Sequence, residues 1–299
     1  MNDIKLEKYP KVILVGTVRN CEKSFYREYT RLIKACKKLN VIDSFFVELD
    51  SNDKTSELLS RLSCTEANFH FETLGILQDK FPNRIERIRY CRNRYIHYVR
   101  ENYVEDSFDY MIVADMDGIN SAISKISFKS CFKVHGWDAL FSNQLLGISD
   151  LLALRAERWI EKDYLIELES ARIELRRTHD SNHFIPRVLK YFKYDLTRKK
   201  YIYDKMRCIG IGKKLIPVIS AFGGIAIYKS WCIFCFDYST EEDYQECEHV
   251  ALNRKLYLHG ANLFINPRFI NSVVNTYNIN KFFLIRNLRL WRWNYLKKE

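Results

Sequence analysis

The sequence has no run of about eighteen apolar residues, which is the minimum for a membrane-spanning helix. Its first ten residues, MNDIKLEKYP, contain no apolar segment of the kind found in a secretory signal. Internal repeats, low-complexity linkers and an evident domain boundary are absent as well. We therefore expect a soluble protein of the cytoplasm that folds as one domain.

A regular cysteine framework is also missing. The nine cysteines are scattered through apolar stretches, and an odd number cannot all pair. Cys232 and Cys235 form a CxxC motif, but no second pair lies at zinc-binding spacing. We expect free thiols in a reducing compartment rather than disulfides or a zinc site.

The charge balance is basic. Lys and Arg number 48 against 37 Asp and Glu, which gives a net charge of +11 and predicts anionic partners such as nucleotides, phospholipid surfaces or nucleic acids. No signature of a nucleic-acid-binding module is present, so we do not expect nucleic acid to be the partner. Hydrophobic residues make up 47% of the chain and aromatic residues 14%, which is ample material for a core.

Short β-branched runs alternate with segments of helical periodicity. This pattern predicts an α/β fold with a mostly parallel, Rossmann-like sheet flanked by helices and ligands bound beyond the carboxyl ends of the strands. A diglycine interrupts the last apolar run, which is either a pair of strands or one kinked strand. The expected strands cover residues 11–16, 41–49, 69–71, 110–114 and 215–228, and the expected helices lie near 25–36, 55–62, 83–103 and 240–258.

Two segments differ from this pattern. Residues 157–214 are charged and tyrosine-rich, and we interpret them as a helical insertion that serves the acceptor within a domain of residues 1–280. Residues 281–299 form a basic aromatic tail, NKFFLIRNLRLWRWNYLKK in its context, which is typical of an amphipathic helix at a membrane interface. The alternative is an end helix that packs on the domain.

Asp115 and Asp117 directly follow the predicted strand 110–114. Residues two apart in an extended chain point to the same side, so both carboxylates could hold one hard cation such as Mg²⁺ or Mn²⁺. Such an ion usually keeps substrate phosphates in its coordination shell. The alternative is an acidic turn completed by Gly118.

Polar residues after the first two strands and on the long helix are candidates for binding a nucleotide donor. The loop residues offer hydrogen-bond groups to ribose or base, and arginine suits bidentate anion binding. Helix capping is the alternative role for Asp53. The candidates are Thr17, Arg19, Asn20, Glu48, Asp50, Ser51, Asp53, Arg84, Arg87, Arg92 and Asn93.

Two further pairs lie in the last third of the chain. Gly223 and Gly224 carry no side chain within an apolar strand, which indicates a bulge or the close approach of a ligand on the acceptor side. Glu248 and His249 offer a carboxylate base and an imidazole, although neighbouring helix positions diverge by about 100°. A cap and a core histidine are the alternatives.

Several ordered segments together resemble GT-A glycosyltransferases similar to the fungal capsule-associated α-1,3-mannosyltransferase family. They are RIRYCRNR (87–94), YMIVADMDG (110–118), WDALFSNQLLGISDLLALR (137–155), SAFGGIAIYK (220–229), ECEHVALN (246–253) and LFINPR (263–268). The resemblance implies a GT-A fold, Asp115 and Asp117 as the metal motif, and Glu248 beside the acceptor. It leaves open whether His249 or His259 meets the metal.

The resemblance implies a metal-dependent transferase that moves a hexose, with mannose favoured, from a GDP- or UDP-sugar to a glycan or lipid-linked acceptor in surface polysaccharide or glycoconjugate synthesis. The tail would then attach the enzyme peripherally to the inner face of a membrane. Glu248 would be the base if configuration inverts, and would orient the acceptor if configuration is retained. The alternatives are a catalytically inactive nucleotide or sugar binder and, with less support, a nucleic-acid-binding protein.

Overall fold

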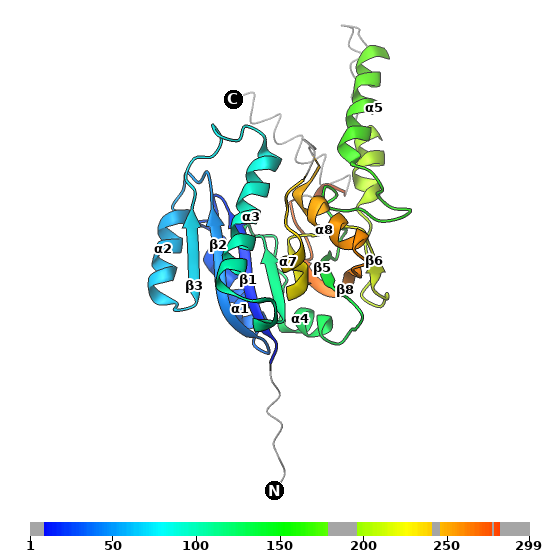
Figure 1. Cartoon of the computed structure of the whole chain (residues 1–299). Coiled ribbons are helices and arrows are strands. Elements are labelled where there is room, and N and C mark those ends of the chain that lie inside the picture. Colours follow the sequence, from blue (N-terminus) through cyan, green and yellow to red (C-terminus); the bar gives the residue numbers. More distant parts are fainter. Residues whose placement is uncertain (1–8, 179–195, 241–245, 277, 282–299) are drawn as a thin grey trace.

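A computed structural model of the chain describes residues 9–178, 196–240, 246–276 and 278–281. Within these residues the molecule has three layers, with one mixed sheet between two groups of helices (Figure 1). The expected α/β class with a mostly parallel, helix-flanked sheet is confirmed.

The sheet of the described residues has eight strands in the order β3-β2-β1-β4-β7-β5-β8-β6. Six strands run in one direction, while β7 is antiparallel to β4 and β5, and β6 is antiparallel to β8. The strands are β1 (Lys11–Val18), β2 (Asn40–Glu48), β3 (Phe69–Thr73), β4 (Tyr110–Ala114), β5 (Ala139–Gln144), β6 (Ile216–Pro217), β7 (Ile225–Lys229) and β8 (Leu263–Ser272).

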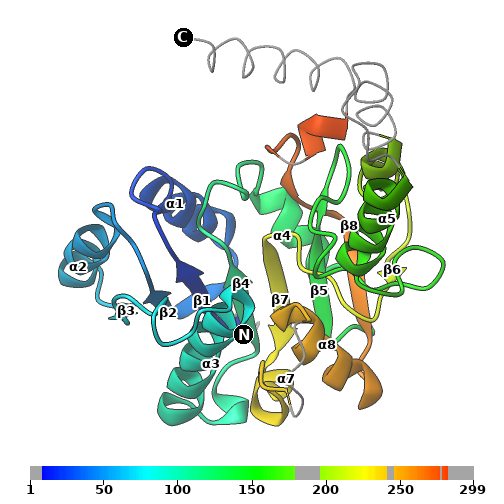
Figure 2. The same ribbon diagram turned by 90° about the horizontal axis from the view of Figure 1, so that it is seen from above.

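The helices cover both faces of the sheet. Helices α1, α2 and α4 lie on one face, and α3, α7 and α8 on the other (Figure 2). The described helices are α1 (Phe25–Ala35), α2 (Thr55–Thr65), α3 (Arg84–Asn102), α4 (Lys125–Cys131), α5 (Tyr164–Thr178), α7 (Ser230–Cys235) and α8 (Glu248–Leu258), with 3₁₀ turns at Glu105–Ser107, Tyr203–Lys205 and Asn278–Lys281.

The expected strands and helices up to residue 114 are confirmed, because each has a clear period and an apolar face. For the run 215–228 the expected pair of strands is confirmed, while the expected position of the diglycine inside a strand is wrong. Gly223 and Gly224 precede β7 instead of lying inside it, and both have positive φ angles, +73° and +102°. The run 215–228 contains two strands, β6 and β7, which pair with different neighbours.

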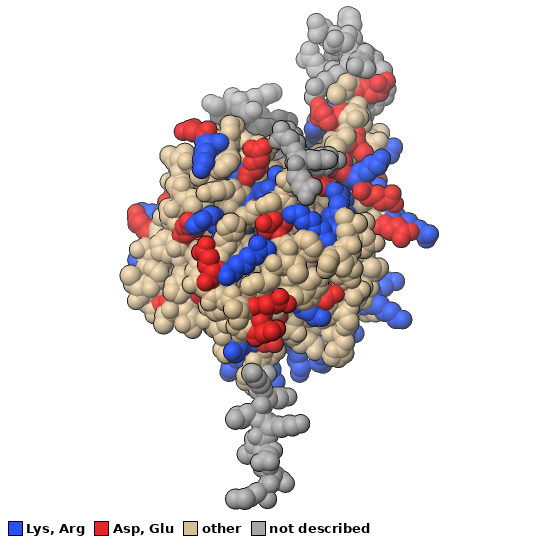
Figure 3. Space-filling model, viewed as in Figure 1, with Lys and Arg blue, Asp and Glu red and all other residues tan. Residues whose placement is uncertain are grey.

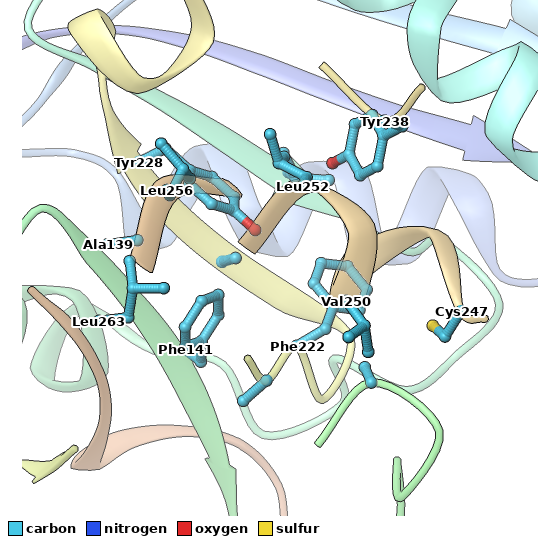
Figure 4. Close-up of a cluster of buried hydrophobic side chains, with 14 of the residues drawn as sticks. Ala139, Phe141, Phe222, Tyr228, Tyr238, Cys247, Val250, Leu252, Leu256 and Leu263 are labelled. Carbon is cyan, nitrogen blue, oxygen red and sulfur yellow. The ribbon is translucent and has the colours of Figure 1, made fainter. Parts of the chain in front are cut away.

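Helix α8 anchors the second half of the sheet. Val250, Leu252 and Leu256 are fully buried, and Figure 4 shows these side chains grouped with Phe141 and Tyr228 of β5 and β7. Burying large apolar side chains contributes roughly 1.5–3 kcal/mol each, relative to leaving them exposed. The start of α8, with Glu248, is therefore held firmly against the sheet.

The predicted insertion 157–214 contains α5 and the 3₁₀ turn at Tyr203–Lys205 in its described part. In Figure 1, α5 extends away from the sheet. Residues 179–195 and the predicted tail helix after residue 281 lie outside the described residues. No helix among the described residues is both long and apolar enough to cross a bilayer. All nine cysteines are free, as expected.

Candidate active site

A cleft of about 690 Å³ opens at the carboxyl ends of β1, β2, β4 and β5. The point between β1 and β4 is where connections leave in opposite directions along the sheet, and such a switch point is where ligands bind in α/β proteins. Of the predicted site residues, eleven line the cleft: Thr17, Arg19, Arg84, Arg87, Arg92, Asp115, Asp117, Gly223, Gly224, Glu248 and His249.

Asp115 and Asp117 come from the turn after β4. The backbone N–H of Asp115 donates to the Gly224 carbonyl at 2.9 Å, which ties this turn to the diglycine. The exposed Asp117 accepts a hydrogen bond at Oδ1 from the Ile119 N–H at 3.2 Å, and Gly118 has φ +102°. The acidic turn considered from the sequence therefore exists, and it directs both carboxylates into the same cleft.

Glu28 of α1 holds this turn through hydrogen bonds. Its buried carboxylate accepts hydrogen bonds from the N–H groups of Gly118 at 2.8 Å and Asn120 at 2.6 Å. Burial raises the pKa of Glu28 to about 7, although the two N–H donors oppose this shift. Ser24 Oγ also donates to the Met116 carbonyl at 2.6 Å. Helix α1 thus fixes both ends of the acidic turn.

The surroundings of Asp115 raise the pKa of its carboxyl group. Burial is the main cause that raises its pKa to about 7, the nearby Asp117 and Asp150 raise it further, and Arg92 lowers it. No group of three or more His, Cys, Asp or Glu side chains in the described residues could hold a metal by itself. Two carboxylates nevertheless suit Mg²⁺ or Mn²⁺ when substrate phosphates supply the remaining ligands, so the residues present fit such an ion.

Arg92 of α3 connects the acidic turn to α8. Its Nε donates to Glu248 Oε1 at 3.1 Å and its Nη2 to Asp115 Oδ1 at 3.3 Å. The guanidinium carbon lies 5.2 Å from the centre of the Phe222 ring and 5.9 Å from that of Tyr238. Since Arg92 is only 4% exposed and already pairs with two carboxylates, its main contacts are with the protein itself.

His249 lies next to Glu248 in the cleft wall. Its ring stacks on Phe222 with 3.7 Å between the ring centres, and neither ring nitrogen has a hydrogen-bond partner among the described residues. Burial and the charge of Arg92 hold its pKa well below the usual value, so the imidazole is neutral at physiological pH. His259 ends α8, contacts Trp231 and Phe236, and is not part of the cleft lining.

Three predicted donor ligands use their hydrogen bonds to join two loops instead. Ser51 Oγ accepts from the Asn20 N–H at 3.0 Å, Asn20 Oδ1 accepts from the Asn52 N–H at 2.9 Å, and Asp53 Oδ2 accepts from the Glu22 N–H at 3.1 Å. Asp53 Oδ1 also accepts from the N–H of Thr55, the first residue of α2, but the N-cap of this helix is Lys54, so Asp53 is not the cap that was its alternative role. Asn20, Ser51 and Asp53 do not line the cleft.

Glu48 and Asn93 also lie outside the cleft lining. The buried Glu48 accepts from the Ser51 N–H at 3.0 Å, so it shapes the turn after β2. Asn93 binds the segment before α8, because its Oδ1 accepts from the Tyr238 N–H at 2.9 Å and its Nδ2 donates to Ser239 Oγ at 3.0 Å. On α3, Arg92 therefore lines the cleft, whereas Asn93 contacts the segment before α8.

The arginines at the mouth of the cleft differ in whether they are paired with a carboxylate. Arg87 pairs with Asp50 at 3.2 Å, and Asp50 also accepts from the Leu77 and Gln78 N–H groups. Arg19 donates only to the Asp50 carbonyl, at 3.2 Å, and the exposed Arg84 has no ion pair within the described part of the chain. Arg19 and Arg84 are therefore the cations best placed to meet an anionic ligand.

The diglycine fits tightly into its surroundings. A Cβ atom on Gly224 would lie 2.5 Å from the Ile119 side chain, and one on Gly223 would lie 2.9 Å from Ser142 Oγ. Protein atoms thus largely occupy the space that the missing side chains leave. The sequence had led us to expect room for a sugar there. Both glycines still line the cleft through their backbones.

Asp150 is a site residue that the sequence analysis missed. It lies in the cleft wall, and its Oδ2 accepts from the Gly223 N–H at 3.2 Å. Burial is the main cause of its raised pKa, and the nearby Glu248 raises it further. The segment ALFSNQ that precedes it is β5, and the rule that polar residues after a buried strand reach the sheet edge could have identified it.

No protein-family model and no curated protein match the sequence. Among solved structures, one similar chain is the mannosyltransferase PcManGT from Pyrobaculum calidifontis in complex with GDP-Man and Mn²⁺, with 11% identity, a TM-score of 0.47, and coverage of 90% of this chain and 59% of that one. Another is S. aureus TarS 1–349 in complex with UDP, with 11% identity, a TM-score of 0.43, and coverage of 85% and 57%. This chain thus spans less than two thirds of either structure. At this similarity, neither structure assigns a family or an activity to this chain.

Proposed function

We propose that this chain is a metal-dependent glycosyltransferase of the GT-A type, which moves a hexose, with mannose favoured, from a nucleotide-diphosphate sugar to a glycan or lipid-linked acceptor. The observation that supports this most directly is the shared cleft of Asp115, Asp117 and Glu248, in which Arg92 joins Asp115 to Glu248. The proposed cation site and the proposed base thereby share one cleft of about 690 Å³. Such a volume suits a small-molecule ligand.

Asp115 and Asp117 would hold Mn²⁺ or Mg²⁺ together with the donor's diphosphate. When bound, the ion would stabilise the negative charge that the departing nucleotide diphosphate gains. Arg19 and Arg84 at the mouth of the cleft would add two cations near that charge, and Glu28 would keep the acidic turn in place. Because Asp115 is paired with Arg92, the ion would have to share or replace one contact of that carboxylate.

Glu248 is the proposed base in an inverting reaction. One carboxylate oxygen, Oε1, accepts from Arg92, while Oε2 has only a 3.6 Å contact from the Cys247 thiol among the described residues. Oε2 would accept the proton of the acceptor hydroxyl as the new bond to the anomeric carbon forms and the bond to the diphosphate breaks. If configuration is retained, the same oxygen would orient the acceptor. The neutral His249 would offer a hydrogen-bonding nitrogen beside it.

The first test is a thermal-shift screen of GDP-, UDP-, CMP- and dTDP-sugars, each with Mn²⁺ and with EDTA. A ligand that binds only the native protein raises its melting temperature, so we expect one nucleotide class to stabilise the chain in Mn²⁺ and not in EDTA. Release of nucleoside diphosphate from the same donor then distinguishes an enzyme from an inactive binder. No shift with any donor, with or without metal, would contradict the proposed donor site.

The proposed setting in surface polysaccharide or glycoconjugate synthesis, the cytoplasmic location and the membrane-binding role of residues 281–299 stay predictions. That tail lies outside the described residues. Removing the residues after Asn280 should lower binding to liposomes while the reaction with a soluble acceptor continues. Unchanged liposome binding would favour the alternative, in which the tail packs on the domain.

A further inference from the structure

Helices α1 and α4 form a strongly basic surface on one face of the sheet. The segments 21–39 and 121–135, which contain these helices, hold nine Lys and Arg residues but only two acidic residues, Glu22 and Glu28. Glu28 is buried and bound to the acidic turn, so it does not face solvent. On the face viewed in Figure 3, by contrast, Lys and Arg are interspersed with Asp and Glu.

A shallow groove of about 490 Å³ lies between α1 and the start of α4. Four basic side chains line it, Arg27, Arg31, Lys34 and Lys125, and no acidic residue does. The three on α1 follow at intervals of four and three residues, which places them along one side of the helix. None of the four forms an ion pair or hydrogen bond with the described residues, whereas Arg87, Arg92, Arg155 and Arg254 all pair with carboxylates.

Apolar side chains are exposed on the same surface. Tyr26 lines the groove and is 59% exposed, and Ile126, next to Lys125, is 81% exposed. A soluble polyanion would bind the cationic side chains but would gain little from contact with an exposed isoleucine. A bilayer interface uses both, because apolar and aromatic side chains enter the headgroup region while Lys and Arg meet the anionic lipids.

We propose that the surface made by Arg27, Arg31, Lys34 and Lys125, with Tyr26 and Ile126, docks on the anionic phospholipid headgroups of a membrane. We name it the α1–α4 surface. It is separate from the active-site cleft, since no residue lines both. The proposal goes beyond the proposed activity and does not depend on it. It is also separate from the predicted role of the tail.

The test is co-sedimentation of the full chain with vesicles of phosphatidylcholine alone and with about one third phosphatidylglycerol. We expect binding only to the anionic vesicles. Each Lys or Arg near such a surface strengthens binding roughly fivefold, so the triple variant Arg27→Gln, Arg31→Gln, Lys34→Gln should bind about a hundredfold more weakly than the unchanged protein. Glutamine is a good helix former, and equal melting temperatures would show that the fold is unchanged.

A matched control separates this surface from net charge. The variant Lys162→Gln, Lys213→Gln, Lys214→Gln removes the same charge from exposed positions outside α1 and α4, and should bind within about twofold of the unchanged protein. Equal losses in the two triple variants, or no loss in the α1 variant, would overturn the proposal. Equal binding to neutral and anionic vesicles would overturn it too.

A second variant distinguishes a bilayer from a soluble polyanion. Tyr26→Ser with Ile126→Ser should weaken binding to anionic vesicles several-fold, but leave binding to a single-stranded oligonucleotide unchanged. If this variant binds the vesicles like the unchanged protein while the α1 triple variant loses the oligonucleotide, the surface binds polyanions and the membrane proposal is wrong.

Discussion

Arg92 Nε lies 3.1 Å from Glu248 Oε1, and this buried ion pair joins α3 to the first residue of α8. The same guanidinium reaches Asp115 at 3.3 Å, so one cation holds both the proposed metal ligand and the proposed base. Without Arg92, the carboxylates of Glu248 and Asp115 would lose the cation that they share. Arg92 therefore sets the geometry and the electrostatics of the site together.

Replacing Arg92 should destabilise the protein strongly. Arg92→Ala would leave Glu248 and part of Asp115 buried without their cation, and such a loss costs about 3–5 kcal/mol. Arg94→Ala on the same helix is the control, because Arg94 and Glu72 form a half-exposed pair, which is worth roughly 1 kcal/mol. Urea unfolding measures both. Similar small losses in the two variants would show that the Arg92 pairs contribute little to stability.

Asp117→Ala should abolish donor stabilisation by Mn²⁺ while leaving the fold intact. The side chain is exposed and accepts a single hydrogen bond among the described residues, so we expect the free energy of unfolding to change by less than about 1 kcal/mol. Thermal shifts with the donor, with and without Mn²⁺, provide the measurement. Asp79→Ala removes another exposed carboxylate away from the cleft and should keep the shift. A full metal-dependent shift in the Asp117 variant would remove Asp117 from the proposed site.

The sequence predicted the first four strands and the helices between them, because each has an apolar period that only one secondary structure satisfies. It did not predict that β7 runs antiparallel between β4 and β5. The order and direction of strands depend on pairing between segments that are distant in the sequence. A β-branched run such as Ile225–Lys229 has the same pattern whether the strand is parallel or antiparallel to its neighbours. Strand β5 was not recognised at all, since ALFSNQ mixes polar residues with apolar ones.

The prediction of the candidate site was best for residues that reach the cleft simply because they lie at the end of a strand. Asp115, Asp117 and Thr17 reach the cleft because they follow β4 and end β1. Asn20 and Ser51 follow strands equally well, yet their side chains bond to the neighbouring loop. Whether a polar side chain faces a ligand or a loop depends on hydrogen-bond partners about thirty residues away, and no local pattern reports them. Glu28 was missed for the same reason.

Glu28 should make stability fall as pH rises. Its pKa is about 7 in the folded protein and near 4.5 when unfolded, so between these values the folded state binds more protons. Stability is thus lost as pH rises from about 4.5 to 7, by at most about 3 kcal/mol from this group. In Glu28→Gln this contribution disappears, although the amide accepts one N–H bond fewer at the turn. The stability difference between the two proteins, measured by urea unfolding from pH 5 to about 8, should change by this amount. A difference that does not vary with pH would contradict the raised pKa.

Gly224→Ala tests how closely the diglycine fits the acidic turn. Gly224 has φ +102°, which strains any residue with a Cβ, and the added methyl would lie 2.5 Å from Ile119 and 3.1 Å from Asn271 Nδ2. Because the Gly224 carbonyl also accepts from the Asp115 N–H, relief of the clash would move the turn itself.

Gly136→Ala is the matched control, with φ +75° and open space around the new methyl, and should cost only about 1–2 kcal/mol. Gly224→Ala should cost more than about 3 kcal/mol by urea unfolding, since steric overlap adds to backbone strain. Equal losses in the two variants would mean that the contact between the diglycine and Ile119 is loose enough to relax, and the diglycine would then play no part in placing Asp115.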